Sequence, residues 1–210
     1  MFFARTPPLV KLLYPGRIWN MDREERTVYL TFDDGPIPQL TPWVLEQLVA
    51  NNAKATFFCI GKNADKDQVI LKKIIEAGHT IGNHSWSHLR GTRTPTAAYV
   101  KDVLRADTAL GLIVGETAKP LFRPPYGRIT NDQVRELKNR YRVVMWDVLS
   151  GDFDTRTTPE QCLKNVIRNI RSGSIVVFHD SLKAEERLRY ALPLTLEFLR
   201  KEGYTMKAIR

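Results

Sequence analysis

The sequence predicts a single α/β domain that folds as a distorted (β/α) barrel with about seven parallel strands. Apolar runs of strand length alternate with amphipathic helical segments, which is typical of parallel strands joined by right-handed crossovers. Polar residues stand directly after several of these strands. In a barrel all such strand ends open onto one rim and can share a site, whereas an open doubly wound sheet uses mainly the loops at its switch point. The barrel is therefore favoured over the open sheet.

The chain organisation agrees with one domain. Its 210 residues, 43% hydrophobic and 26% charged, suffice for one large core. No linker, low-complexity tract or fixed repeat divides them. We expect residues 1–26, the lead-in, to be irregular apart from a helical turn near Val10–Leu13, and residues 27–210 to form the domain.

The first half of the chain shows clear element boundaries. The first strand runs through Val28-Tyr29-Leu30 into Thr31-Phe-Asp-Asp-Gly-Pro36, where glycine permits unusual backbone angles and proline removes a ladder donor. Thr41-Pro42 supplies an N-cap and a first-turn proline for a helix over 41–49. A continuous apolar run predicts a buried strand over 55–60. A helix over 67–77 and a short strand over 80–83 follow.

The second half continues the same alternation of helical spacing and apolar runs. The expected helices are 96–112, 131–139, 158–171 and 186–201, and the expected strands are 121–122, 142–147, 174–178 and 204–209.

Composition limits the classes of partner. The net charge is +9, but Lys and Arg are scattered along the chain and mixed with acids, as in Lys183-Ala-Glu-Glu-Arg187. This favours a solvated basic surface, and we expect no nucleic-acid partner. Cys59 and Cys162 lie far apart in apolar or helical contexts, which suits buried free thiols. The oligomeric state is left open.

The N-terminal sequence and the hydropathy of the chain bear on its location. Charged residues and prolines interrupt the apolar residues of the first eleven positions. This N-terminal segment therefore does not resemble a secretory signal. No later stretch reaches transmembrane length. The expected location is cytoplasmic, unless a leader has been removed from the mature chain.

Two adjacent carboxylates, Asp33 and Asp34, stand at the mouth of the first strand. A chain that turns at Asp-Gly-Pro can aim both acids into one cleft, where they would repel each other unless a cation lay beside them. A metal site with a general base beside it is one interpretation. The alternative is a turn in which these residues serve only the backbone.

Two of the four histidines form His84-Ser-Trp-Ser-His88, after the strand over 80–83. If the segment is a helical turn, four-residue spacing brings both imidazoles to one side. With a strand-end carboxylate they would form a His-His-Asp set suited to zinc or another borderline divalent ion. Such an ion lowers the pKa of bound water toward about 7 and polarises a carbonyl, so the chemistry indicated is hydrolysis.

Two further polar residues follow strands. Arg123-Pro-Pro-Tyr-Gly127 could be a rigid turn with a surface arginine, or its guanidinium could hold one carboxylate of the acid pair ionised. His179 could be a hydrogen-bonded core residue, or with a carboxylate partner it could donate a proton to a leaving amine.

Taken in order, these motifs resemble the polysaccharide deacetylase family, whose members include chitooligosaccharide and peptidoglycan N-acetylglucosamine deacetylases. The segments that carry the resemblance are Thr31-Phe-Asp-Asp-Gly-Pro36, His84-Ser-Trp-Ser-His88, Arg123-Pro-Pro-Tyr126 and Val177-Phe-His179. It spans roughly residues 27 to 209 and implies a distorted barrel of about seven strand–helix units.

The resemblance also implies roles for individual residues. Asp33 matches the general base and His179 the general acid. Arg123 matches the arginine that orients the base, and Tyr126 the position whose backbone N–H stabilises the oxyanion. The implied metal ligands are Asp34, His84 and His88, with zinc expected and cobalt or nickel possible.

One motif departs from the family pattern of two acids three residues apart followed by tryptophan. Asp152 fits the second acid, which tunes the catalytic histidine, and Phe153 stands where the family has tryptophan. Leu149 occupies the position of the first acid. Asp147 is an additional acid without an assigned role.

The resemblance therefore implies metal-dependent removal of N-acetyl groups from amino-sugar polymers or oligomers, with release of acetate. Trp86, Trp146 and Phe153, together with Tyr126, are the aromatic residues available to stack on sugar. Two alternatives remain: a hydrolase of a small non-sugar amide or cyclic imide, and an inactive carbohydrate-binding relative.

Overall fold

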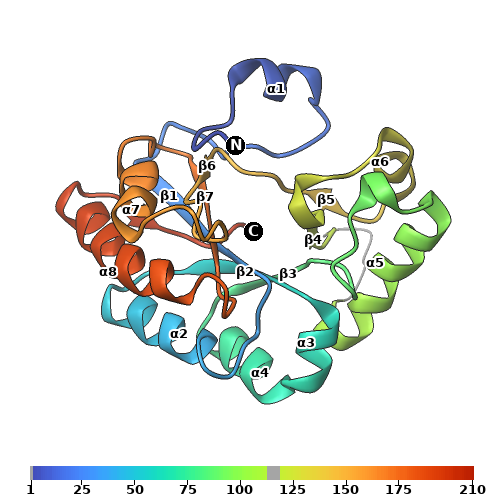
Figure 1. Ribbon diagram of the computed structural model, residues 1–210, viewed down its shortest axis with the longest axis horizontal. Helices are drawn as coiled ribbons and strands as arrows, with labels where there is room; N and C mark the ends of the chain where they lie inside the picture. Colours follow the sequence, from blue (N-terminus) through green and yellow to red (C-terminus); the bar gives the residue numbers. More distant parts are fainter. Residues whose placement is uncertain (1, 113–118) are drawn as a thin grey trace.

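The computed structural model of the protein describes residues 2–112 and 119–210. Its strands form one curled parallel sheet in the order β5-β4-β3-β2-β1-β7-β6, and β8 pairs with the first residues of β1. Helices cover the outer face of this sheet (Figure 1). The distorted (β/α) barrel that the sequence predicts is thereby confirmed. No helix of the described residues is both long and apolar enough to cross a membrane.

The strands are β1 (Thr27–Asp33), β2 (Ala55–Cys59), β3 (Thr80–Asn83), β4 (Leu121–Phe122), β5 (Arg142–Val143), β6 (Val148–Leu149), β7 (Ile175–His179) and β8 (Thr205–Met206). The α-helices are α1 (Pro8–Leu13), α2 (Thr41–Ala50), α3 (Gly61–Lys66), α4 (Gln68–Glu76), α5 (Thr96–Leu110), α6 (Asn131–Leu137), α7 (Pro159–Ile167) and α8 (Glu185–Lys201). Two short 3₁₀ helices, η1 (Gly91–Arg93) and η2 (Pro125–Gly127), lie in loops.

The apolar core lies on both faces of the sheet. Alternate residues of β1 and β2, such as Leu30, Phe32 and Phe57, pack outward against the helices. A smaller cluster around Phe58 and Ile175 fills the inside of the barrel. Cys59 and Cys162 are buried free thiols, as expected.

The predicted strand over 142–147 is in fact a crossing between the two edges of the sheet. Its first part, β5, pairs with β4, and the chain then reaches β7 through β6. Between them, the Met145 amide donates a hydrogen bond to the Ile18 carbonyl at 2.7 Å instead of to a neighbouring strand. A continuous apolar run cannot reveal this change of partner, because Val143, Val144 and Met145 remain buried throughout it.

The lead-in closes the gap that this crossing leaves between β5 and β6. Arg5 forms an antiparallel bridge with Val148, and Ile18 forms a parallel bridge with Val144. Figure 1 shows the lead-in and α1 lying over this side of the barrel. None of the residues of α1 is buried, so this helix stands on the outside of the closure.

Asp147 fixes the lead-in to the barrel. Its side chain is fully buried and forms ion pairs with Lys11 and, at 3.4 Å, with Arg23. Ser174 Oγ donates a further hydrogen bond to it at 2.7 Å. Burial opposes the charged form, yet the Lys11 and Ser174 hydrogen bonds hold the pKa of Asp147 below its ordinary value. The acid without a role in the sequence is thus a structural anchor.

Candidate active site

Strand register places two of the predicted catalytic residues side by side. β1 lies between β2 and β7, and its last residue, Asp33, pairs with Phe58 on one side and His179 on the other. Because parallel strands end at the same edge of a sheet, the loops that follow them meet above Asp33. The site therefore forms at the carboxyl ends of the strands.

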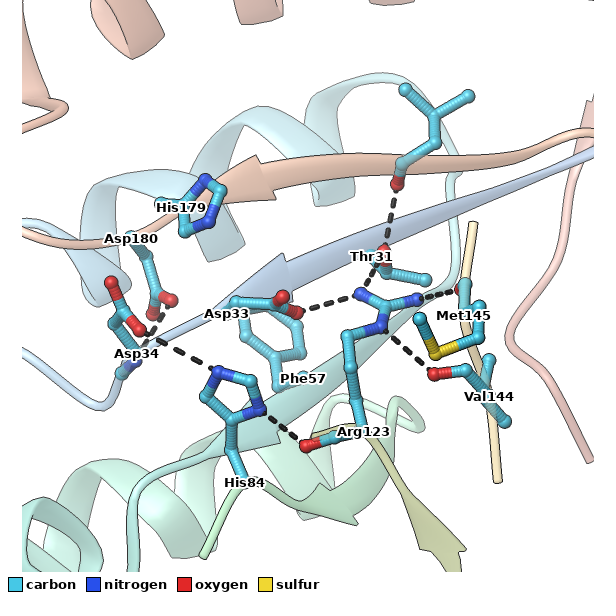
Figure 2. A network of polar contacts seen from close by, with 12 residues as sticks. Thr31, Asp33, Asp34, Phe57, His84, Arg123, Val144, Met145, His179 and Asp180 are labelled. Atoms are coloured by element: carbon cyan, nitrogen blue, oxygen red, sulfur yellow. Dashed lines mark hydrogen bonds and ion pairs between the residues drawn. The ribbon is translucent and has the colours of Figure 1, made fainter. Parts of the chain in front are cut away.

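Asp33 is held by a fully buried arginine. Nη1 of Arg123 donates to Asp33 Oδ1 at 2.7 Å and to Thr31 Oγ1 at 2.7 Å, and Nη2 donates to the Met145 carbonyl at 2.9 Å (Figure 2). The guanidinium lies 4.1 Å from the centre of the Phe58 ring. A planar group with its donors occupied on several sides cannot rotate, so Asp33 is fixed in orientation.

The turn after Asp33 is held by Asp180, a residue for which the sequence analysis predicts no role. The Gly35 amide donates to Asp180 Oδ1 at 3.1 Å, and Thr41 Oγ1 donates to Oδ2 at 2.5 Å. Burial raises the pKa of Asp180 to about 8. Asp34 has a φ of +85°, a left-handed conformation that costs a non-glycine residue free energy and that these contacts maintain.

The loop that carries the two histidines is irregular, so the helical turn considered for it is not formed. Ser85 and His88 have positive φ values of 61° and 57°. The Ser85 amide donates to the side-chain oxygen of Asn83 at 2.7 Å, and Asp102 accepts from the next two amides at 3.1 and 3.0 Å. These contacts nevertheless bring the rings of His84 and His88 to 5.1 Å between centroids.

Asp34, His84 and His88 offer one ligand atom each, and all three atoms lie within 4.8 Å of one another. Nε2 of His88 is 3.3 Å and Nε2 of His84 is 3.8 Å from Asp34 Oδ1. His84 Nδ1 lies 2.7 Å from the Arg123 carbonyl, which requires Nδ1 to carry the proton and leaves Nε2 as an acceptor. Three atoms that can each bind a metal ion therefore lie close enough to share one.

The protonation states also suit a cation. Burial, with the charge of His88, lowers the pKa of His84 to about 3, and burial also lowers the pKa of His88. Both rings are thus neutral near pH 7, and a neutral imidazole can offer an unprotonated nitrogen to a cation. Among the described residues, Asp34 Oδ1 is buried and has no hydrogen-bond donor. A divalent metal fits this set, because one carboxylate oxygen and two imidazole nitrogens are usual ligands for zinc.

His179 and Asp152 form a second polar pair across the cleft. Nδ1 of His179 donates to Asp152 Oδ1 and its backbone amide donates to Oδ2, both at 2.8 Å. Burial disfavours imidazolium, but the charge and hydrogen bond of Asp152 outweigh it and raise the pKa of His179 to about 9. Buried Arg187 donates from Nε to the Asp152 carbonyl at 2.7 Å. The sequence offers no signal for this arginine beyond its place on an amphipathic helix.

Tyr126 lies in η2 with a φ of +59°, and its ring centroid is 4.5 Å from that of His88. Within the described part of the chain, its backbone amide donates no hydrogen bond. An amide held in a strained turn beside the histidines is free to donate to a ligand.

A cleft of about 830 Å³ connects these groups. Asp33, Asp34, His84, His88 and His179 open into it, and so do Tyr126, Trp146 and Phe153. Trp86 is absent from the described lining and packs against the main core, with Arg105 over its ring at 4.0 Å. The lead-in contributes Phe2, Phe3 and Trp19 to the lining. The sequence could not predict this, because these residues reach the cleft only when the lead-in packs between β5 and β6.

A buried acid fixed by an arginine, beside a candidate three-ligand metal set and a histidine paired with a carboxylate, is the arrangement of a hydrolase. Comparison with known proteins agrees. The family model for polysaccharide deacetylase matches residues 20–146. A peptidoglycan-N-acetylglucosamine deacetylase of Bacillus cereus is 33% identical over 188 residues, which cover 89% of this chain and 87% of the relative. A chitooligosaccharide deacetylase of Bradyrhizobium is 34% identical, with 77% of this chain and 74% of the relative covered.

A solved structure agrees closely as well. The Bc1960 peptidoglycan N-acetylglucosamine deacetylase, in complex with 4-naphthalen-1-yl-N-oxidanyl-benzamide, superimposes with a TM-score of 0.86 and 28% identity over 97% of this chain and 95% of that one. Among the curated relatives, the chain covers 87% of one Bacillus cereus peptidoglycan deacetylase, 56% of another and 39% of a Listeria monocytogenes peptidoglycan deacetylase. The chain belongs to the polysaccharide deacetylase family, and its enzyme class is that of a polysaccharide N-deacetylase.

Proposed function

We propose that the protein is a metal-dependent hydrolase that removes N-acetyl groups from amino-sugar polymers or oligomers of the peptidoglycan or chitooligosaccharide type. The observation that carries this proposal is the position of Asp33. It lies between a candidate metal set and His179 on one cleft, with Arg123 fixing its carboxylate. The named activities of the relatives support the same reaction.

Each step of the amide hydrolysis has a residue suited to it. Asp33, oriented by Arg123, takes the proton of the attacking water. The oxygen of that water bonds to the acetamide carbon, and the Tyr126 amide donates to the resulting oxyanion. His179 then gives its proton to the departing nitrogen as the carbon–nitrogen bond breaks, so that acetate and a free amine leave.

Asp34, His84 and His88 would hold the metal, for which we propose zinc, with cobalt or nickel able to replace it. When bound, such an ion supplies Lewis acidity, which lowers the pKa of water and polarises a carbonyl.

Acetate release tests the proposal. Metal-stripped protein would be assayed on N-acetylglucosamine oligomers without metal and with zinc, cobalt or nickel, alongside Asp33→Asn and the exposed control Asp132→Asn. We expect turnover only with metal, retained by Asp132→Asn and lost by at least about 100-fold in Asp33→Asn, which should still bind zinc. Near wild-type rates in Asp33→Asn would refute the assignment of the base.

Simple amides and cyclic imides belong in the same assay. If these are hydrolysed and no acetylated sugar is, the substrate is a small amide. If the protein binds zinc and oligomers but turns over neither kind of substrate, it is a binding relative and the proposal is wrong.

A further inference from the structure

The first residues of the lead-in run alongside β6 at the edge of the cleft. The Leu149 amide donates to the Ala4 carbonyl at 2.8 Å, and the Thr6 amide donates to the Asp147 carbonyl at 2.9 Å. Thr6 Oγ1 donates to the Trp146 carbonyl at 2.7 Å. Backbone bonds on both sides of Arg5 therefore fix this stretch, which places the two aromatic residues before it at the cleft.

Phe2 is packed into the wall of the cleft. Its ring lies 5.3 Å from that of Phe153, whose own ring lies 5.3 Å from that of His179. A Cβ added to Gly151 would come within 2.3 Å of the tip of the Phe2 ring, so the ring fills the space that this glycine leaves open. A continuous aromatic wall thus runs from the lead-in to the histidine assigned as general acid.

Phe3 lies next to this wall but, unlike Phe2, its ring is largely exposed to solvent. Its side chain is 73% exposed, although it belongs to the cleft lining. The C–H face of a pyranose ring covers such an exposed aromatic ring well, because both surfaces are flat and apolar. No ring of this kind is needed to hydrolyse the acetamide itself, so its use would lie in binding a neighbouring sugar.

We propose that Phe3 is the stacking platform of a sugar subsite on the Phe153 side of the cleft, held in position by Phe2. This inference rests on the proposed function and extends it. The substrate would be a chain of at least two sugars, with the N-acetylated unit at the metal set and its neighbour on Phe3.

Phe3→Ala, Phe3→Trp and Leu12→Ala test the proposal. Leu12 is a matched control, because it is 75% exposed on the same lead-in and does not belong to the cleft lining. Acetate release would be followed with N-acetylglucosamine oligomers of increasing length. For oligomers, Phe3→Ala should raise KM about 3- to 10-fold, which is the loss expected for one stacking contact, with kcat unchanged. Phe3→Trp should keep KM within about 2-fold, and Leu12→Ala should match the wild type.

An unchanged KM in Phe3→Ala for every oligomer would overturn the subsite. A binding measurement separates this result from failure of the proposed function. Calorimetric titration of Asp33→Asn and of Asp33→Asn/Phe3→Ala with the same oligomers needs no turnover. Weaker binding in the double variant would support the subsite even if the wild type released no acetate, and equal affinity would overturn it.

Discussion

Arg123 contacts several residues of the site and holds them in position. It is fully buried, pairs with Asp33, and donates to Thr31 and to the Met145 carbonyl. Burial lowers the pKa of such a group, and the negative charge of Asp33 opposes that effect. Its own carbonyl accepts from His84, so one residue positions both the proposed base and a proposed metal ligand.

Replacing Arg123 by lysine should therefore be severe although the charge is kept. An ammonium group is a point charge and cannot serve a carboxylate, a hydroxyl and a carbonyl in one plane. We expect activity to fall by at least about 100-fold and the free energy of unfolding by about 3 kcal/mol, measured by acetate release and urea denaturation. Arg135→Lys, at an exposed pair with Asp132, should change neither. Full activity in Arg123→Lys would contradict the positioning role.

The His179–Asp152 pair predicts how activity depends on pH. His179 must be protonated to act as an acid, so activity should fall as the pH rises through its pKa, about 9. Asp152→Asn removes the charge that raises this pKa, so the alkaline limb of the kcat profile should move to lower pH. A bound cation would lower the pKa in both proteins and leave the direction of the difference intact. An unmoved limb would mean that another group supplies the proton.

The same pair should make the free energy of unfolding depend on pH, and the direction of that dependence follows from the raised pKa of His179. Because the pKa of His179 is raised on folding, the pair stabilises the folded state fully below the unfolded pKa of about 6.5. That contribution is lost as the pH rises through about 9. Asp152→Asn should therefore destabilise the protein more at pH 6 than at pH 10 in urea denaturation, and equal effects at both values would contradict the assignment.

At the level of elements, the turn between β1 and α2 is packed so tightly that it has no space for a side chain at Gly35. A Cβ on Gly35 would lie 2.1 Å from Asp180 Oδ2, which also accepts from Thr41. Gly35→Ala should displace the turn that carries Asp34 and weaken zinc binding at least about 10-fold in competition with a chelator. Gly16→Ala is the control, because nothing lies within 4 Å of its added Cβ. Equal zinc affinity in the two variants would show that the turn can yield without moving Asp34.

The lead-in is an element whose contribution to stability should be measurable through Asp147. Asp147→Asn leaves Lys11 without its buried partner, so we expect the free energy of unfolding to fall by about 1–3 kcal/mol near pH 7. The pKa of Asp147 is lowered on folding, so this stabilisation exists above the unfolded pKa and disappears as the pH falls through the folded pKa. Urea denaturation should show the two proteins converging in acid. Glu76→Gln, at an exposed helical pair, is the matched control.

These elements also show how far the sequence could predict the fold. β1, β2, β3 and β7 were predicted closely, because each is a continuous apolar run with a clear end. β6 and α3 were missed. Most of residues 142–149 remain buried while the chain changes partner strands, and Gly61–Lys66 has few apolar residues to mark it as a helix.

Some residues of the candidate site could likewise be predicted from the sequence, and others could not. Asp33, Asp34, His84 and His88 could be predicted because strand ends and short spacing mark them. Asp180, Arg187 and Phe3 could not, because their roles arise from contacts between segments far apart in the chain.

At the scale of the whole molecule, charge is distributed unevenly around the cleft. The protein has a net charge of +9, and the arginine and lysine side chains that line the cleft are Arg90, Arg128 and Lys183. Among the described lining residues, the only acids are Asp33 and Asp34, which face Arg123 and the candidate metal set. The outer part of the cleft should therefore have a positive potential and attract sugar chains that carry carboxylates.

Ionic strength tests this attraction. The Debye length falls from about 30 Å at 0.01 M salt to about 8 Å at 0.15 M, so added salt should lower kcat/KM for a carboxylated amino-sugar polymer far more than for neutral oligomers. Changing Arg90, Arg128 and Lys183 together to glutamine should remove most of that salt dependence. Changing Lys72, Lys138 and Lys201, which do not line the cleft, removes the same net charge and should leave the dependence nearly intact. If both triple variants lowered the salt dependence equally, the net charge of the molecule would attract the substrate, and the cleft cations would have no special part in it.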